Sequence, residues 1–174
     1  PEQKLAIVDA ATGDVWFGGR GGLVSRMASD GRWQTLQIPV RIRDWRVQAI
    51  AVDPRTGDKW FGYQGGLSRL GNDGRQETFT EANGLVDNYV NAVAIDPATG
   101  EKWIGTTDGV SALGPDGSWR SFTGADGLAH DYVYSVAIEG ITGDKWFGTS
   151  LGLSRLGSDG AWQLLGVWNG LVDA

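Results

Sequence analysis

Few side chains in this sequence are suited to acid–base, nucleophilic or metal chemistry. The chain has no cysteine and a single histidine, His130. Thiolate nucleophiles, cysteine-based zinc or iron–sulfur sites and serine–histidine or cysteine–histidine pairs therefore lack a necessary member or depend on that one residue. We expect His130 to be a loop residue with no catalytic role, and we expect neither a cofactor nor a metal site.

Acidic residues recur at regular spacing, but in turn sequences. One set follows Thr-Gly and the other precedes Gly, which is the chemistry of tight turns. We therefore predict turn-stabilising or solvated roles for them and not paired catalytic carboxylates. The first set is Asp14, Asp58, Glu101 and Asp144, and the second is Asp30, Asp73, Asp116 and Asp159.

The glycine-rich run from Gly18 to Gly22 is similar in composition to a phosphate-binding loop. Such a loop lies between a strand and a helix N-terminus and is followed by Lys and Ser or Thr. The run aligns instead with hairpin turns elsewhere in the chain. The sequence therefore favours a turn, and the spacing of a calcium-binding loop is missing as well.

Composition describes an acidic globular chain of 174 residues with a formal net charge of −6. Hydrophobic residues make up 41% and charged residues 21%, which argues against disorder, so the 28 glycines are expected to mark turns. A sequence pI near 4.7 offers no basic surface for nucleic acid or anionic lipid. No apolar run reaches the roughly 18 residues of a membrane span. We expect no nucleic-acid partner and no membrane insertion.

The dominant pattern is an internal repeat of about 43 residues. Residues 47–89 and 90–132 align without a gap, 133–174 follow in the same register, and 1–46 form a more divergent copy with an extra residue near Val24. Trp16, Trp60, Trp103 and Trp146 share one repeat position. The copies fill the chain, so we predict one domain, 1–174, built from units 1–46, 47–89, 90–132 and 133–174.

Each unit contains four short strand-like runs separated by turn residues. In the second unit the strands are expected at about Val47 to Asp53, around Trp60-Phe61-Gly62, at Leu67 to Leu70 and at about Arg75 to Thr80. Four antiparallel strands in about 43 residues is the size of a β-propeller blade. We predict an all-β fold, a β-propeller of four four-stranded antiparallel blades with essentially no helix.

Side-chain size also fits radial packing of such blades. The first strand of the second unit is apolar on both faces, with small residues at alternate positions, Ala49 and Ala51, as expected close to a propeller axis. The first unit departs from this with Leu5 and Ile7. The repeated tryptophans offer large surfaces for the gaps between blades, so we predict structural roles for them.

The unit resembles the two-component regulator propeller repeat of bacterial extracytoplasmic sensor regions. The resemblance rests on the Asp-Pro-x-Thr-Gly turn, on Trp60-Phe61-Gly62, Trp103-Ile104-Gly105-Thr106 and Trp146-Phe147-Gly148-Thr149, and on the closing Asn83-Gly84-Leu85. It is weakest over residues 34–46, where Arg41-Ile42 replaces Gly-Leu. It implies a bacterial sensing or binding propeller that is periplasmic or secreted, from a family whose rings usually have seven or more blades.

Positions that differ among the copies are the candidates for ligand binding. They lie in the loops from each outer strand to the next inner strand and in the turns between second and third strands, which share one face of a propeller. Trp45 and Trp168 have no counterpart in the other units, so we expect them to anchor a ligand. The alternative is ordinary solvated loops with tyrosines wedged between blades. The candidates are Arg20, Arg41, Trp45, Arg46, Tyr63, Gln64, Asn88, Tyr89, Asp108, Asp131, Tyr132 and Trp168.

Three functions are compatible with these features. The first is a non-enzymatic ligand-binding or sensing module for a glycan or peptide, the second a structural, self-associating propeller fragment, and the third a lyase similar to the streptogramin lyases. For assembly we expect a homodimer that closes an eight-bladed ring. A closed ring of four blades and an open fragment of a longer propeller are the alternatives.

Overall fold

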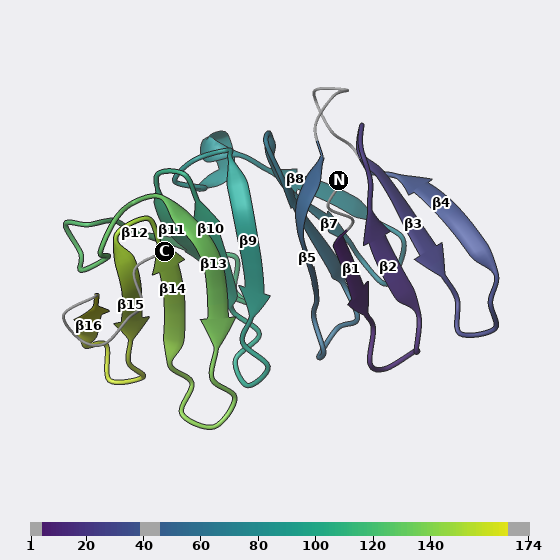
Figure 1. Ribbon diagram of the computed structural model, residues 1–174. Coiled ribbons are helices and arrows are strands. Elements are labelled where there is room, and N and C mark those ends of the chain that lie inside the picture. The colour runs from purple at the N-terminus through teal and green to yellow at the C-terminus, as the bar shows by residue number, and fades with distance from the viewer. Residues whose placement is uncertain (1–4, 39–45, 167–174) are drawn as a thin grey trace.

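A computed structural model describes residues 5–38 and 46–166 of the chain as an all-β fold (Figure 1). Within these residues there are four sheets of four strands, each in the order of the sequence, and every pairing is antiparallel. The first two sheets are β1 (Leu5–Val8), β2 (Val15–Gly18), β3 (Leu23–Met27), β4 (Trp33–Gln37), and β5 (Val47–Val52), β6 (Lys59–Tyr63), β7 (Gly66–Leu70), β8 (Gln76–Phe79). The others are β9 (Val90–Ile95), β10 (Lys102–Thr106), β11 (Gly109–Leu113), β12 (Trp119–Phe122), and β13 (Val133–Ile138), β14 (Lys145–Thr149), β15 (Gly152–Leu156), β16 (Trp162–Leu165).

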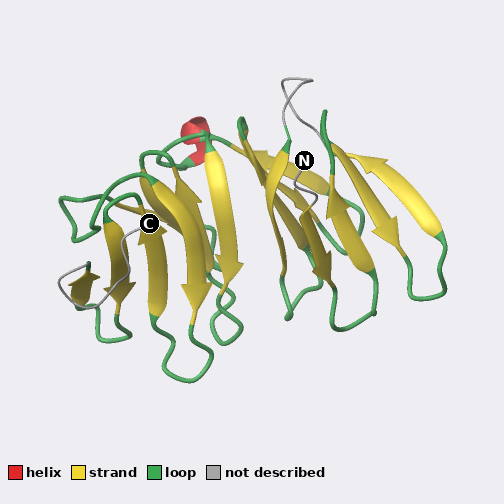
Figure 2. Ribbon diagram, in the orientation of Figure 1, coloured by secondary structure: helices red, strands yellow, loops and turns green. Residues whose placement is uncertain are grey.

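These sheets confirm the predicted four-bladed all-β propeller architecture. The only helix among the described residues is a three-residue 3-10 turn, η1 (Glu81–Asn83), drawn in red in Figure 2. The extra residue of the first unit lies in the β2–β3 turn rather than at Val24 itself. There, Gly21 and Gly22 adopt positive φ angles of 64° and 74°, which a non-glycine residue rarely takes.

The blades form an arc in which the inner strands follow one another. β1 packs against β5, β5 against β9 and β9 against β13, and among the described strands no comparable β13–β1 packing closes the circle. Figure 1 shows the first two blades on one side and the last two on the other. Blades 1 and 4 therefore each have one face that no blade of this chain covers.

Aromatic packing fills each gap between consecutive blades. On the second strand of a blade, the tryptophan points to the following blade and the next residue points to the preceding one. Trp16 meets Phe61 with ring centroids 6.2 Å apart, and Trp103 meets Phe147 at 5.7 Å. Trp103 is 1% exposed and Phe147 is fully buried. The predicted structural role of these tryptophans is confirmed at the three internal gaps.

Small residues let the inner strands approach. Ala49 and Ala51 are each 6% exposed, as the radial packing argument predicted. The glycine of the Trp-aromatic-Gly sequence serves the same purpose. A Cβ placed on Gly62 would lie 2.4 Å from Val90 of the next blade, and one on Gly105 would lie 2.7 Å from Val133. A side chain at either glycine would push the blades apart.

A buried ion pair crosses each internal gap. The lysine that precedes the tryptophan of one blade reaches the aspartate that ends the inner strand of the blade before it. The Lys102 Nζ lies 3.0 Å from the Asp53 carboxylate, and the same nitrogen lies 5.4 Å from the centre of the Trp60 ring. Lys59 with Asp9 and Lys145 with Asp96 repeat this contact at 3.1 and 3.4 Å.

The repeated acids do stabilise turns, but several are buried rather than solvated. Asp58 is 6% exposed; it accepts hydrogen bonds from Arg69 Nε at 2.7 Å and from the backbone N–H of Asn72 at 2.9 Å. Burial acts to raise the pKa of Asp58, but these hydrogen bonds outweigh it and hold that pKa below its ordinary value. Asp14 with Arg26 and Asp144 with Arg155 repeat the arrangement. Each pair ties the β-turn after the first strand to the third strand of its blade.

We expect Trp103→Ala to lower the free energy of unfolding by roughly 3–5 kcal/mol, because it leaves a cavity between blades 3 and 4. Urea denaturation followed by intrinsic fluorescence or circular dichroism measures the change. Ile141→Ala is the control, since Ile141 is 95% exposed and its truncation should change stability by less than about 0.5 kcal/mol. Equal losses in the two variants would contradict the packing described above.

We also expect acid to destabilise the fold. The pKa values of Asp14, Asp58 and Asp144 are lowered in the folded state, so their contribution to stability is fully present above the unfolded-state pKa of about 3.9. It is lost as the pH falls below that value through the folded-state pKa. The urea midpoint should therefore drop between pH 5 and pH 2, and less steeply in Asp58→Asn than in the matched Asp159→Asn variant. Identical slopes in the two variants would contradict this explanation.

Candidate functional site

The two sets of variable positions meet at one end of the arc, as predicted. The backbone of each turn between the second and third strands is hydrogen-bonded to a loop that enters or leaves its blade. Gln64 pairs with Tyr89 in an isolated β-bridge, and Arg20 pairs with Arg46. The Gly109 N–H donates to the Asp131 carbonyl at 2.7 Å. We call this end of the blades the loop face.

Not every predicted site residue is available there. Arg41, Trp45 and Trp168 lie outside the described residues. Tyr63 is 1% exposed, and its hydroxyl accepts a hydrogen bond from Ser68 Oγ at 3.3 Å. Tyr63 is therefore a core residue and not a ligand contact: it ends β6, a strand whose residues are all buried, and it bonds within its own blade.

Two further candidates brace the loops between blades. Asn88 Oδ1 accepts the Glu81 N–H at 2.9 Å, and Asn88 Nδ2 donates to the Glu81 carboxylate at 2.6 Å. Asp131, at the same repeat position, accepts the Gly124 N–H at 2.6 Å. These side chains hold the loops in shape. The remaining described candidates, with surface on the loop face, are Arg20, Arg46, Gln64, Tyr89, Asp108 and Tyr132.

A feature that the sequence analysis missed lies on the inner strands. The pairing of the first and second strands shifts by one residue in blades 2, 3 and 4, and the unpaired residues are Gln48, Asn91 and Tyr134. A β-bulge of this kind re-aims a side chain and is frequent beside binding sites. The sequence marks each bulge with a polar or bulky residue at the second position of a mostly apolar inner strand.

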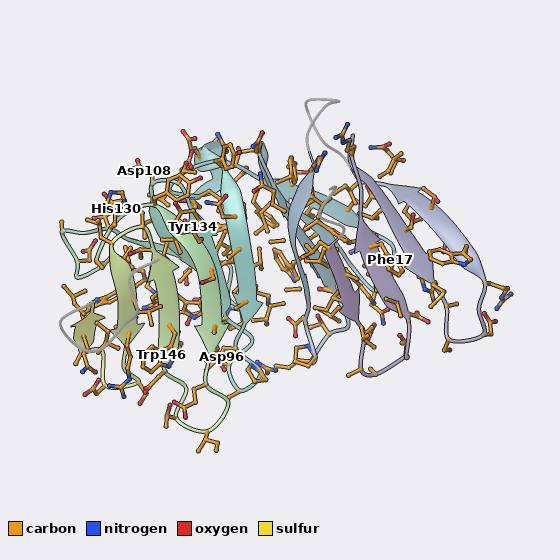
Figure 3. The ribbon with its side chains drawn as sticks, viewed as in Figure 1. Phe17, Asp96, Asp108, His130, Tyr134 and Trp146 are labelled. Carbon is orange, nitrogen blue, oxygen red and sulfur yellow. The ribbon has the colours of Figure 1, made fainter. Side chains whose placement is uncertain are left out.

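The bulge in blade 4 places an exposed tyrosine next to a half-buried one. Tyr134 is 58% exposed, and its ring centroid lies 4.7 Å from that of Tyr132 with an interplanar angle of 45°. Figure 3 shows Tyr134, His130 and Asp108 at the same end of blades 3 and 4, away from Asp96 and Trp146. We call Tyr132, Tyr134, His130 and Asp108 the tyrosine patch. Flat rings at the same end of the blades as a carboxylate and an imidazole suit a polar ligand with an apolar face.

The histidine of this patch has a structural partner. His130 Nδ1 accepts the Tyr132 backbone N–H at 2.9 Å, so the neutral ring carries its proton on Nε2. The side chain is exposed and no hydroxyl or carboxylate partner is found for it among the described residues. Within residues 5–38 and 46–166, no group of three or more His, Asp or Glu side chains is placed to hold a metal ion.

Two grooves lie outside the tyrosine patch, one at the margin of the loop face and one away from it. One, of about 570 Å³, runs along the uncovered face of blade 1, where Phe17, Leu23, Trp33 and Arg46 line it. The other, of about 530 Å³, lies between blades 2 and 3. Its charged lining is already paired, Lys102 with Asp53 and Arg69 with both Asp58 and Glu77. The first groove is the more apolar of the two.

Comparison with known proteins identifies the fold. No protein-family model matches the chain, and no curated protein sequence matches it either. The extracellular domain of the hybrid two-component system BT3049 from B. thetaiotaomicron is similar in structure, with a TM-score of 0.81 at 22% identity. That likeness covers 97% of this chain and 24% of that one. The resemblance predicted from the repeat is thus confirmed at the level of the fold.

Other solved structures share the same arrangement of blades. Virginiamycin B lyase from Staphylococcus aureus has a TM-score of 0.74 at 16% identity, over 94% of this chain and 59% of the lyase. The extracellular domain of BT4673 from B. thetaiotaomicron has a TM-score of 0.72 at 17% identity, over 87% and 21% of the two chains. This chain therefore spans less than two thirds of each neighbour. Within the described residues, no helix is long and apolar enough to cross a membrane.

Proposed function

We propose that this chain is a non-enzymatic binding part of a bacterial extracytoplasmic sensing propeller, and that the tyrosine patch holds its ligand. The observation that carries the proposal is the pairing of the exposed Tyr134 with the half-buried Tyr132, with rings 4.7 Å apart. Two of the similar structures are extracellular domains of signalling systems, which supports the location and the sensing role.

The chemistry of the patch indicates the class of ligand. Tyrosine rings stack on the apolar face of a sugar or on a peptide side chain and add little ordering cost, because each has only two side-chain torsions. Asp108 and the Nε2–H of His130 supply an acceptor and a donor for hydroxyl or amide groups. A glycan or a short polar peptide fits this combination.

Tyr134 is the residue whose substitution tests this site most cleanly. The equivalent position of blade 3 is Asn91, so Tyr134→Asn keeps a residue that the blade template accepts. A ligand at 100 times its Kd adds about 2.7 kcal/mol to stability, which a thermal-shift screen of glycans and peptides detects. For a ligand found in this way, we expect Tyr134→Asn to weaken binding by roughly 2 kcal/mol while leaving the melting temperature of the free protein unchanged.

The matched control is Ile141→Asn, on an exposed turn at the opposite end of blade 4. It should bind the ligand as the unmodified chain does. A ligand that binds Tyr134→Asn and the unmodified chain equally would show that the tyrosine patch is not the site. A screen without any stabilising ligand would favour the structural, self-associating alternative.

A lyase remains the second candidate because of the similarity to virginiamycin B lyase, in which a His-to-Ala variant is catalytically inactive. His130 is the only histidine here. If this chain were such an enzyme, it would act on a streptogramin B substrate and His130→Ala would abolish that turnover. We expect no turnover by either protein, measured by mass spectrometry of the substrate; turnover lost on His130→Ala would overturn the non-enzymatic proposal.

A further inference from the structure

The two uncovered blade faces carry the same contact residues that join blades inside the chain. On blade 1, Phe17 and Trp33 lie with ring centroids 5.4 Å apart, and on blade 4 the equivalent Phe147 and Trp162 lie 5.7 Å apart. In blade 4 these rings are covered by Trp103 and Phe122 of blade 3. In blade 1 nothing in the described chain covers them, and Trp33 is 64% exposed.

The opposite face of blade 4 carries the residues that cover such rings. Trp146 stands at the repeat position of Trp103, and Leu165 at that of Phe122, as the strand registers show. Figure 3 shows Phe17 and Trp146 on the two terminal blades. Gly148 stands at the repeat position of Gly62 and Gly105, the small residues that let the inner strand of the next blade approach. Each end therefore presents one half of an internal junction.

At both ends of the arc, one residue of the internal Lys–Asp pair is replaced. The lysine that precedes the tryptophan in blades 2, 3 and 4 is replaced in blade 1 by Val15, which pairs with Val8 in the same register. The aspartate that receives this lysine is replaced in blade 4 by Glu139, whose carboxylate is engaged by Thr142 Oγ1 at 2.8 Å. Glu139 also brings a carboxylate to this position, but its side chain is exposed and bonded to Thr142 within its own turn, so it does not need a lysine across the junction.

We propose that the uncovered face of blade 4 docks onto the uncovered face of blade 1 of a second copy, and that two such junctions close a ring of eight blades. Both junctions use the same pair of faces, so the assembly has two-fold symmetry and needs no surface beyond these two. The groove of about 570 Å³ beside Phe17 and Trp33 is the seat that Trp146 and Leu165 of the other copy fill.

The size of the arc fits this assembly. The four blades match 59% of the lyase chain, so two arcs together contain more blade than one such ring. Eight blades is within the usual range of propellers. Two junctions of this kind are expected to bury on the order of 2,000 Å² in total, the size of obligate interfaces. The proposal does not depend on the ligand site on the loop face.

Size-exclusion chromatography with light scattering tests the assembly. We expect a mass of about 37 kDa, twice the 18.6 kDa of one chain, at micromolar concentration. Phe17→Glu and Trp146→Glu should each give a single 18.6 kDa species with an unchanged β-sheet circular dichroism spectrum. Ile141→Glu, at an exposed turn outside both faces, should stay dimeric. A monomeric unmodified chain, or a dimer that survives both face variants, would overturn the proposal.

Cross-linking tests the direction of the contact. Because the chain has no cysteine, Val15→Cys and Glu139→Cys can be introduced as unique labels. The double variant should yield a covalent dimer with a short bismaleimide, and each single variant should yield none. Dimers from a single variant would show that like faces pair, and a ladder of larger products would show an open chain of copies. Either result would contradict the closed ring.

Discussion

The fold depends on one constraint: a blade is a four-stranded sheet with two apolar faces, and each face must be covered by another blade. Burial of large aromatic surface supplies the main stabilisation, as hydrophobic burial does in most domains. The alternation along the second strand, with Trp103 directed to one neighbour and Ile104 to the other, lets a single strand serve two interfaces. Stability therefore comes from junctions between blades more than from the sheets themselves, as in other repeat proteins.

Polar contacts fix the geometry that the aromatic packing leaves undetermined. Hydrophobic contact is non-directional, so it sets neither the tilt nor the register of one blade on the next. The Lys102–Asp53 pair joins blade 3 to blade 2 at one fixed position along the strands. The Asp58–Arg69 pair fixes the turn within blade 2. Desolvation offsets much of the attraction in such buried pairs. These ion pairs therefore act mainly by fixing the relative position of blades and turns, and they add little to the free energy of unfolding.

The same repetition separates the part of the chain that builds the fold from the part that can bind. Residues that recur at a repeat position are engaged in turns and junctions, even when they are charged. The candidate binding residues lie among the variable loops and turns of the loop face and at the inner-strand bulges of blades 2, 3 and 4. Tyr134 occupies that bulge in blade 4, where Asn91 in blade 3 instead donates to the Val133 carbonyl at 2.9 Å.

The sequence alone determined the repeat, the four-stranded blades and the placing of tryptophans between them, because period, turn residues and side-chain size are local properties of the chain. It also placed the variable loops and turns on one face. Only the tertiary structure decided that Tyr63 is buried, that Asp58 pairs with Arg69 and that Lys102 reaches Asp53 of the previous blade. The Lys102–Asp53 contact joins two units, and the other two outcomes depend on how side chains pack within a folded blade, which the linear repeat pattern does not specify. The partial exposure of Phe17 and Trp146 also comes from the tertiary structure: the repeat marks them as core residues, but each lies on a blade face that no other blade of the arc covers, which leaves it half-buried.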